Sequence, residues 1–66
     1  MNIKLLQKKV EESGLKREYL CAKLFVTRAT LQRKLSGEAE LTVSEMNRLI
    51  SAMRLTEREV RQIFFD

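Results

Sequence analysis

The stretch that decides the fold runs from Arg17 to Leu35 and reads REYLCAKLFVTRATLQRKL. Apolar residues recur in it at helical spacing. They are Leu20, Cys21 and Leu24 in the first part, and Leu31 and Leu35 in the second. Thr27 stands before the second set and has the hydroxyl side chain that helix N-caps prefer. The stretch therefore predicts two short helices joined by a turn of three or four residues, with Cys21 as a small buried residue where they cross.

The second helix of this pair is predicted to present a polar face opposite its two leucines. Ala29 and Arg33, four residues apart, lie on that face, and Arg28 lies one turn before Gln32. In duplex DNA, arginine pairs with guanine, glutamine pairs with adenine, and alanine packs on the thymine methyl group. The same residue types are also ordinary on any solvent-facing helix. The face predicts base reading by Arg28, Ala29, Gln32 and Arg33.

The segments on either side of the pair also predict helices. Near the N-terminus, Ile3, Leu6 and Val10 form an apolar stripe that ends at Ser13-Gly14. Further along, Thr42–Glu45 and Thr56–Glu59 each have the pattern of a capping box, which opens a helix. Because the chain has no proline and only two glycines, we expect one all-α domain of five helices over residues 1–66.

Charge is distributed unevenly along the 66 residues. Residues 1–36 hold nine Lys or Arg and three Glu, a net charge of +6, whereas residues 37–66 hold four Arg and six acids, a net charge of −2. A basic half of this kind is typical of a polyanion-binding surface, although a solvated charged surface is the alternative.

The composition argues against an enzyme. With no histidine and one cysteine, the chain offers no Ser-His or Cys-His nucleophile, no zinc site and no internal disulfide. We therefore expect no catalytic residue, no metal, no cofactor and no small-molecule ligand. The apolar stretch near the N-terminus is too short for a signal peptide or a membrane span, which favours a cytoplasmic protein that binds no membrane.

The segment Leu20–Gly37, LCAKLFVTRATLQRKLSG, resembles the helix-turn-helix of the Cro and repressor-type family of phages and bacteria, also called XRE-like. The later stretches LTVSEM (41–46) and LTEREVRQIFF (55–65) are similar to the way such domains end, so the resemblance covers nearly the whole chain. It implies a five-helix, lambda-repressor-like domain that binds a pseudo-palindromic DNA operator as a homodimer. It also implies a role in transcription regulation, usually as a repressor.

The resemblance also implies roles for single residues. In the family, residues at the starts of the two helices contact DNA phosphates, and Arg17 and Thr27 occupy these positions here. Base-reading positions of the family are occupied by Arg28, Ala29, Gln32 and Arg33. Lys34 and Ser36, near the end of the second helix, correspond to DNA-backbone contacts, and Thr30 on its flank joins this phosphate-contacting set.

Phe25 departs from the family pattern, which has glycine at this position of the turn. If the backbone there has a positive φ, a bulky side chain is strained by about 1–2 kcal/mol. Either the turn is built differently, or Phe25 gains enough burial to offset the strain.

The C-terminal run Ile63-Phe64-Phe65 is unusual in so short a chain. One helix face cannot bury three consecutive large residues, so at least one of them, with Phe65 preferred, is exposed or covered by a partner. We expect these three residues to form the interface of a homodimer through the last helix, which would place two reading helices about 34 Å apart. The alternative is a protein-binding module, or an antitoxin, that docks its partner through the same patch.

Overall fold

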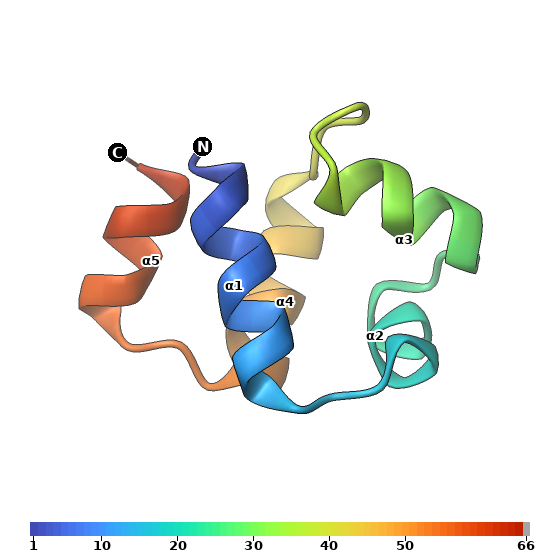
Figure 1. Ribbon diagram of the computed structural model, residues 1–66, viewed down its shortest axis with the longest axis horizontal. Helices are drawn as coiled ribbons and strands as arrows, with labels where there is room; N and C mark the ends of the chain where they lie inside the picture. Colours follow the sequence, from blue (N-terminus) through green and yellow to red (C-terminus); the bar gives the residue numbers. More distant parts are fainter. Residues whose placement is uncertain (66) are drawn as a thin grey trace.

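The computed structural model describes residues 1–65, and in this part of the chain all regular structure is helical (Figure 1). The helices are α1 (Ile3–Ser13), α2 (Arg17–Leu24), α3 (Arg28–Leu35), α4 (Val43–Met53) and α5 (Glu57–Phe64). The prediction of an all-α chain with five helices is thus confirmed. None of these helices is long and apolar enough to cross a lipid bilayer.

Side chains cap three of the helices at the predicted places. Thr27 caps α3, accepting a hydrogen bond from the amide of the residue three positions on (3.2 Å). Thr42 with Glu45, and Thr56 with Glu59, form complete capping boxes at the starts of α4 and α5. Each device satisfies backbone amides that have no partner within the helix, so the local sequence determines where these helices begin.

Two groups of helices share one apolar core. In Figure 1, α1 and α5 run side by side with the ends of the chain close together, α4 lies behind α1, and α2 and α3 lie on the other side. The Asn2 amide donates a hydrogen bond to the Ile63 carbonyl (2.7 Å), and Lys9 Nζ lies 2.7 Å from Glu59 Oε2, so α1 and α5 are joined at both ends. The buried apolar residues are Leu6, Val10, Leu20, Leu24, Leu31, Leu35, Leu41, Leu49, Ile63 and Phe64.

Three residues, Phe25, Val26 and Thr27, connect α2 to α3. Phe25 has the left-handed conformation (φ 57°, ψ 44°), and its amide donates a hydrogen bond to the Cys21 carbonyl to close α2. Phe25 is 79% exposed, so the alternative in which burial offsets the strain is wrong. The turn has the conformation for which glycine is best suited, and here a phenylalanine carries the strain of about 1–2 kcal/mol.

Cys21 is only half-buried, which corrects the prediction of a buried residue at the crossing of the two helices. The buried residues of α2 are Leu20 and Leu24. Cys21 lies about 100° round the helix from Leu20, so its side chain packs at the edge of the core.

Candidate nucleic-acid interface

The outer face of α3 is formed by the four residues predicted to read bases. Arg28, Ala29, Gln32 and Arg33 are all exposed, because the two leucines of α3 are buried and turn the opposite face outward. The sequence therefore placed the exposed face of this helix correctly.

Two long-range contacts hold the C-terminal end of α3 in place. The Gln7 side-chain amide of α1 donates a hydrogen bond to the Leu35 carbonyl (3.0 Å), which is one of the carbonyls that a helix end leaves without a partner. On the other side, Lys34 Nζ lies 2.6 Å from Glu45 Oε1 of α4 and donates to the Glu40 carbonyl (3.2 Å). The C-terminal end of α3 is thus tied to α1 and to α4.

The Lys34–Glu45 pair is largely withdrawn from solvent, with side chains 12% and 10% exposed. Glu45 Oε1 also accepts a hydrogen bond from the Thr42 amide as part of the α4 capping box. Burial by itself raises the pKa of Glu45, but the hydrogen bonds and charge of Lys34 and the Thr42 amide together lower it by more. The net pKa lies below the ordinary value, so the carboxylate stays ionised and Lys34 is occupied inside the protein.

A polar groove of about 330 Å³ lies beside the exposed face of α3. It is lined by the two buried leucines of α3, Leu31 and Leu35, and by polar side chains of α1, α2 and α3 together with Ser36. These polar residues are Gln7, Glu11, Arg17, Arg28, Gln32 and Ser36. The groove thus brings together two predicted base-reading residues, Arg28 and Gln32, and two predicted phosphate contacts, Arg17 and Ser36.

Arg28 is paired with a carboxylate, but at the surface. Its Nη1 lies 3.5 Å from Glu18 Oε1 of α2, and the two side chains are about two-thirds or more exposed. Exposed ion pairs contribute little to stability and are screened by salt, so this contact is easily exchanged for another. Arg33 forms no ion pair within residues 1–65.

The remaining predicted phosphate contacts are hydroxyl residues at the two ends of α3. Thr27 donates its hydroxyl hydrogen to Thr30 Oγ1 (3.1 Å) while accepting from the Thr30 amide, so these two side chains form one local cap. Ser36 donates to the Arg33 carbonyl (3.1 Å) and is exposed. Each hydroxyl is therefore already engaged with the backbone or with a neighbour.

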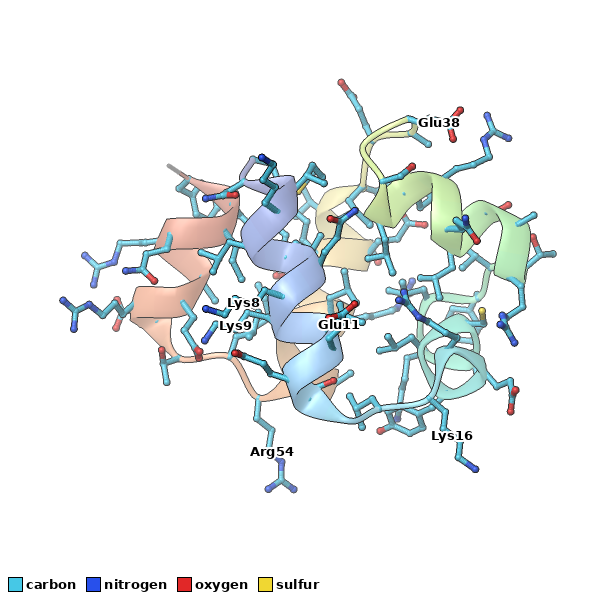
Figure 2. All side chains as sticks on the ribbon, viewed as in Figure 1. Lys8, Lys9, Glu11, Lys16, Glu38 and Arg54 are labelled. Atoms are coloured by element: carbon cyan, nitrogen blue, oxygen red, sulfur yellow. The ribbon has the colours of Figure 1, made fainter. Side chains whose placement is uncertain are left out.

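Two groove residues on α1 were missed by the sequence reasoning. Gln7 and Glu11 are one helical turn apart on the side of α1 that faces α2 and α3, and Figure 2 shows Glu11 on this side. Lys8 and Lys9 lie on the opposite side, toward α5. The four-residue spacing of Gln7 and Glu11 is present in the sequence, but only the packing of α1 against α3 shows that both residues line the groove.

The C-terminal run is divided between the core and the surface. Ile63 and Phe64 are buried in the core, whereas Phe65 is 75% exposed. An interface formed by all three residues is therefore corrected: within one chain, Ile63 and Phe64 are already covered, and Phe65 alone is available to a partner. The preference for Phe65 as the exposed residue is confirmed.

No group of three or more His, Cys, Asp or Glu side chains that could hold a metal ion occurs in residues 1–65. Comparison of the chain with protein-family models, with curated proteins and with solved structures found no match. The likeness to the Cro and repressor-type family therefore rests on the residues of the motif alone.

Proposed function

We propose that this protein is a sequence-specific double-stranded DNA-binding regulator of transcription and that α3 is its reading helix. The observation that carries the proposal is the exposed face of α3, which presents Arg28, Ala29, Gln32 and Arg33 and is bordered by a groove containing a further arginine, Arg17. The B-DNA major groove admits one α-helix, and these residue types match the base edges it displays.

Base reading needs side chains that are exposed but carried on a rigid element. Gln32 and Arg33 meet both conditions, because the end of α3 that carries them is anchored to α1 through Gln7 and to α4 through Lys34. A bidentate contact of either side chain would discriminate between bases by about 1–3 kcal/mol. Arg28 would join them by leaving its exposed contact with Glu18.

Phosphate binding is assigned to the groove between α1, α2 and α3. Arg17, in the first turn of α2, offers a guanidinium there, and the N-terminal ends of helices favour anions through their unpaired amides. Lys34 has a different role in this proposal: its ammonium holds the reading helix against α4, so it positions the base-reading side chains without touching DNA.

A homodimer would suit a pseudo-palindromic operator, in which two half-sites lie about 34 Å apart. In this proposal Phe65 is the anchor of the α5 contact between the two copies, since it is the exposed member of the C-terminal run. The protein would act in the cytoplasm, as a repressor in a bacterium or in a phage-infected cell. The alternative role as a partner-docking module or antitoxin through the same run would also have to use Phe65, because the other two residues are buried.

The decisive experiment selects bound fragments from a random pool of duplex DNA and then measures their affinity at several salt concentrations. We expect an enriched half-site, and an affinity that falls linearly with salt on logarithmic axes as phosphate counterions are released. Failure to enrich any sequence, together with no binding at low salt, would contradict the proposal.

A matched pair of variants tests which helix reads the bases. Arg33→Ala and Arg58→Ala remove the same charge from exposed positions on α3 and α5. We expect Arg33→Ala to weaken the selected site by about 1–3 kcal/mol more than random DNA, whereas Arg58→Ala should affect both DNAs alike and weakly. Equal effects of the two variants would rule out α3 as the reading helix.

A further inference from the structure

A second hollow, of about 550 Å³, lies on the surface between α2 and α4. Two aromatic rings, Tyr19 and Phe25, line it together with the small side chains Ala22 and Ala52. Both aromatic residues are exposed, although large apolar side chains are usually covered when they cluster. The hollow is therefore an apolar surface that the fold of this chain leaves open.

Phe25 is the least expected member of this surface. Its left-handed backbone conformation strains any residue with a side chain, and its ring is mostly in solvent, so the fold does not require a phenylalanine there. A residue that breaks a local rule without a compensating gain in packing points to function. Its contact within the chain is with Arg48, whose guanidinium carbon lies 4.7 Å from the ring centroid.

The charge of the hollow has one sign. Lys23 Nζ lies 5.3 Å from the Tyr19 ring centroid, and Arg48 stands over Phe25, so each ring has a cation beside it. No acidic residue lines the hollow, and neither cation forms an ion pair within residues 1–65. Two exposed rings, each with an unpaired cation over it, are complementary to an apolar side chain flanked by carboxylates.

The hollow is separate from the candidate DNA surface. On α2, Tyr19 lies about 200° round the helix from Arg17, which lines the groove beside α3. A ligand bound between α2 and α4 would therefore not compete with one bound along α3.

We propose that the hollow formed by Tyr19, Phe25 and Arg48 with Lys23 docks an acidic segment of a partner protein. An apolar side chain of the segment enters between the two rings, and its neighbouring carboxylates bind Lys23 and Arg48. This site does not depend on the DNA-binding function, and a regulator that carried both could hold its partner while on DNA.

The test uses a library of random short peptides displayed for selection on the full chain, after which the affinity of the selected peptides is also measured for the Phe25→Gly variant. Glycine suits the conformation of residue 25, so this variant keeps the turn while removing the ring. We expect the selected peptides to be rich in Asp and Glu around an apolar residue, and to bind Phe25→Gly about tenfold more weakly or worse. Arg48→Gln, which removes the charge, should reduce binding to a similar extent.

Five results would overturn the proposal. The first two are a selection that yields no peptides and a selection whose peptides are not rich in Asp and Glu. The third is equal affinity of the selected peptides for Phe25→Gly and for the unmodified chain. The fourth is a loss of duplex DNA affinity in Phe25→Gly as large as that in Arg33→Ala, which would assign the hollow to nucleic acid. The fifth is a shift of the nuclear magnetic resonance signals of these residues with protein concentration alone, which would make a second copy the occupant. A thermal melt of each variant checks that it is folded, and Val43→Ser, in the first turn of α4, serves as the control for loss of an exposed apolar side chain outside the hollow.

Discussion

At the scale of single residues, the structure separates aromatic side chains that look alike in the sequence. Phe64 is buried in the core, while Phe25 and Phe65 are exposed. Lys34 differs in the same way from the exposed cations of α3, because it is held by Glu45 and by the Glu40 carbonyl. Residues of one type therefore have different environments, and their substitution should affect stability and binding differently.

Phe25→Gly is expected to change the free energy of unfolding by less than about 1 kcal/mol. Relief of the left-handed strain, about 1–2 kcal/mol, opposes the greater chain entropy of glycine in the unfolded state and the loss of an exposed cation–π contact. By contrast, Phe64→Ala removes a buried ring and should lower stability by about 3–5 kcal/mol. Urea unfolding measures the free energy of unfolding of both variants. A large decrease in this free energy for Phe25→Gly would show that the ring supports the fold.

Lys34→Ala is expected to lower the free energy of unfolding by about 2–3 kcal/mol, because it leaves the Glu45 carboxylate largely buried with only the capping-box contact. Lys8→Ala, at an exposed position on α1, is the control and should have little effect. The slope of DNA affinity against salt should be the same for Lys34→Ala as for the unmodified chain at a temperature where both are folded. A slope reduced by about one would instead identify Lys34 as a phosphate contact.

At the scale of the elements, the sequence predicted what is decided locally. The starts of α3, α4 and α5 follow from side-chain caps within three residues of each helix start, and the end of α1 follows from Gly14. The ties that position α3 join residues far apart in the chain, such as Gln7 with Leu35, so periodicity and spacing contain no signal for them. The exposure of the Phe25 ring was not predictable either, because the residue type alone does not indicate whether its ring is buried or its backbone is strained.

The α1–α5 pair should make stability depend on pH in acid. Because the Lys9 ammonium and the Thr56 amide stabilise the carboxylate, the pKa of Glu59 is lowered from 4.5 to about 2. The unfolded chain then binds more protons than the folded chain between these values, so stability rises with pH across this window and is lost as pH falls toward 2. Thermal melts of the unmodified chain and of Glu59→Gln from neutral pH to about pH 2 measure this, and the variant should lack that part of the pH dependence. Identical pH profiles would show that the pair contributes nothing.

The groove between α1 and α3 contains one acid, Glu11, beside the guanidinium groups of Arg17 and Arg28. If phosphate binds there, Glu11→Gln should raise DNA affinity by about two- to fivefold, because it removes a repulsive charge. Glu12→Gln is the matched control, since its carboxylate lies near Lys9 on another side of α1. Fluorescence anisotropy with one duplex measures the DNA affinity of both variants. A larger increase in affinity for Glu12→Gln than for Glu11→Gln would show that the phosphates do not bind in this groove.

At the scale of the whole molecule, a chain of 66 residues has a small core and an exposed aromatic residue at its end, Phe65. Small domains bury a modest share of their surface, and association with a second copy adds to it. We expect the unmodified chain to form dimers in sedimentation experiments at high micromolar concentration and Phe65→Glu to remain monomeric with an unchanged melting curve at low concentration. A chain that is monomeric both alone and on DNA would contradict a Phe65 interface.

The contact of α1 with α5 also bears on how this protein is made by the ribosome. The hydrogen bond from Asn2 to Ile63 and the ion pair of Lys9 with Glu59 join segments separated by about the whole sequence, and such contacts close late because a long loop must be ordered first. During translation α1 is synthesised before the helices that pack against it, α3, α4 and α5, so its apolar stripe of Leu6 and Val10 is not fully covered until they follow. The α2–α3 pair depends on a later helix in the same way, because α2 packs mainly against α4. A truncated gene that ends after α3 should therefore yield an unstructured product that proteases degrade.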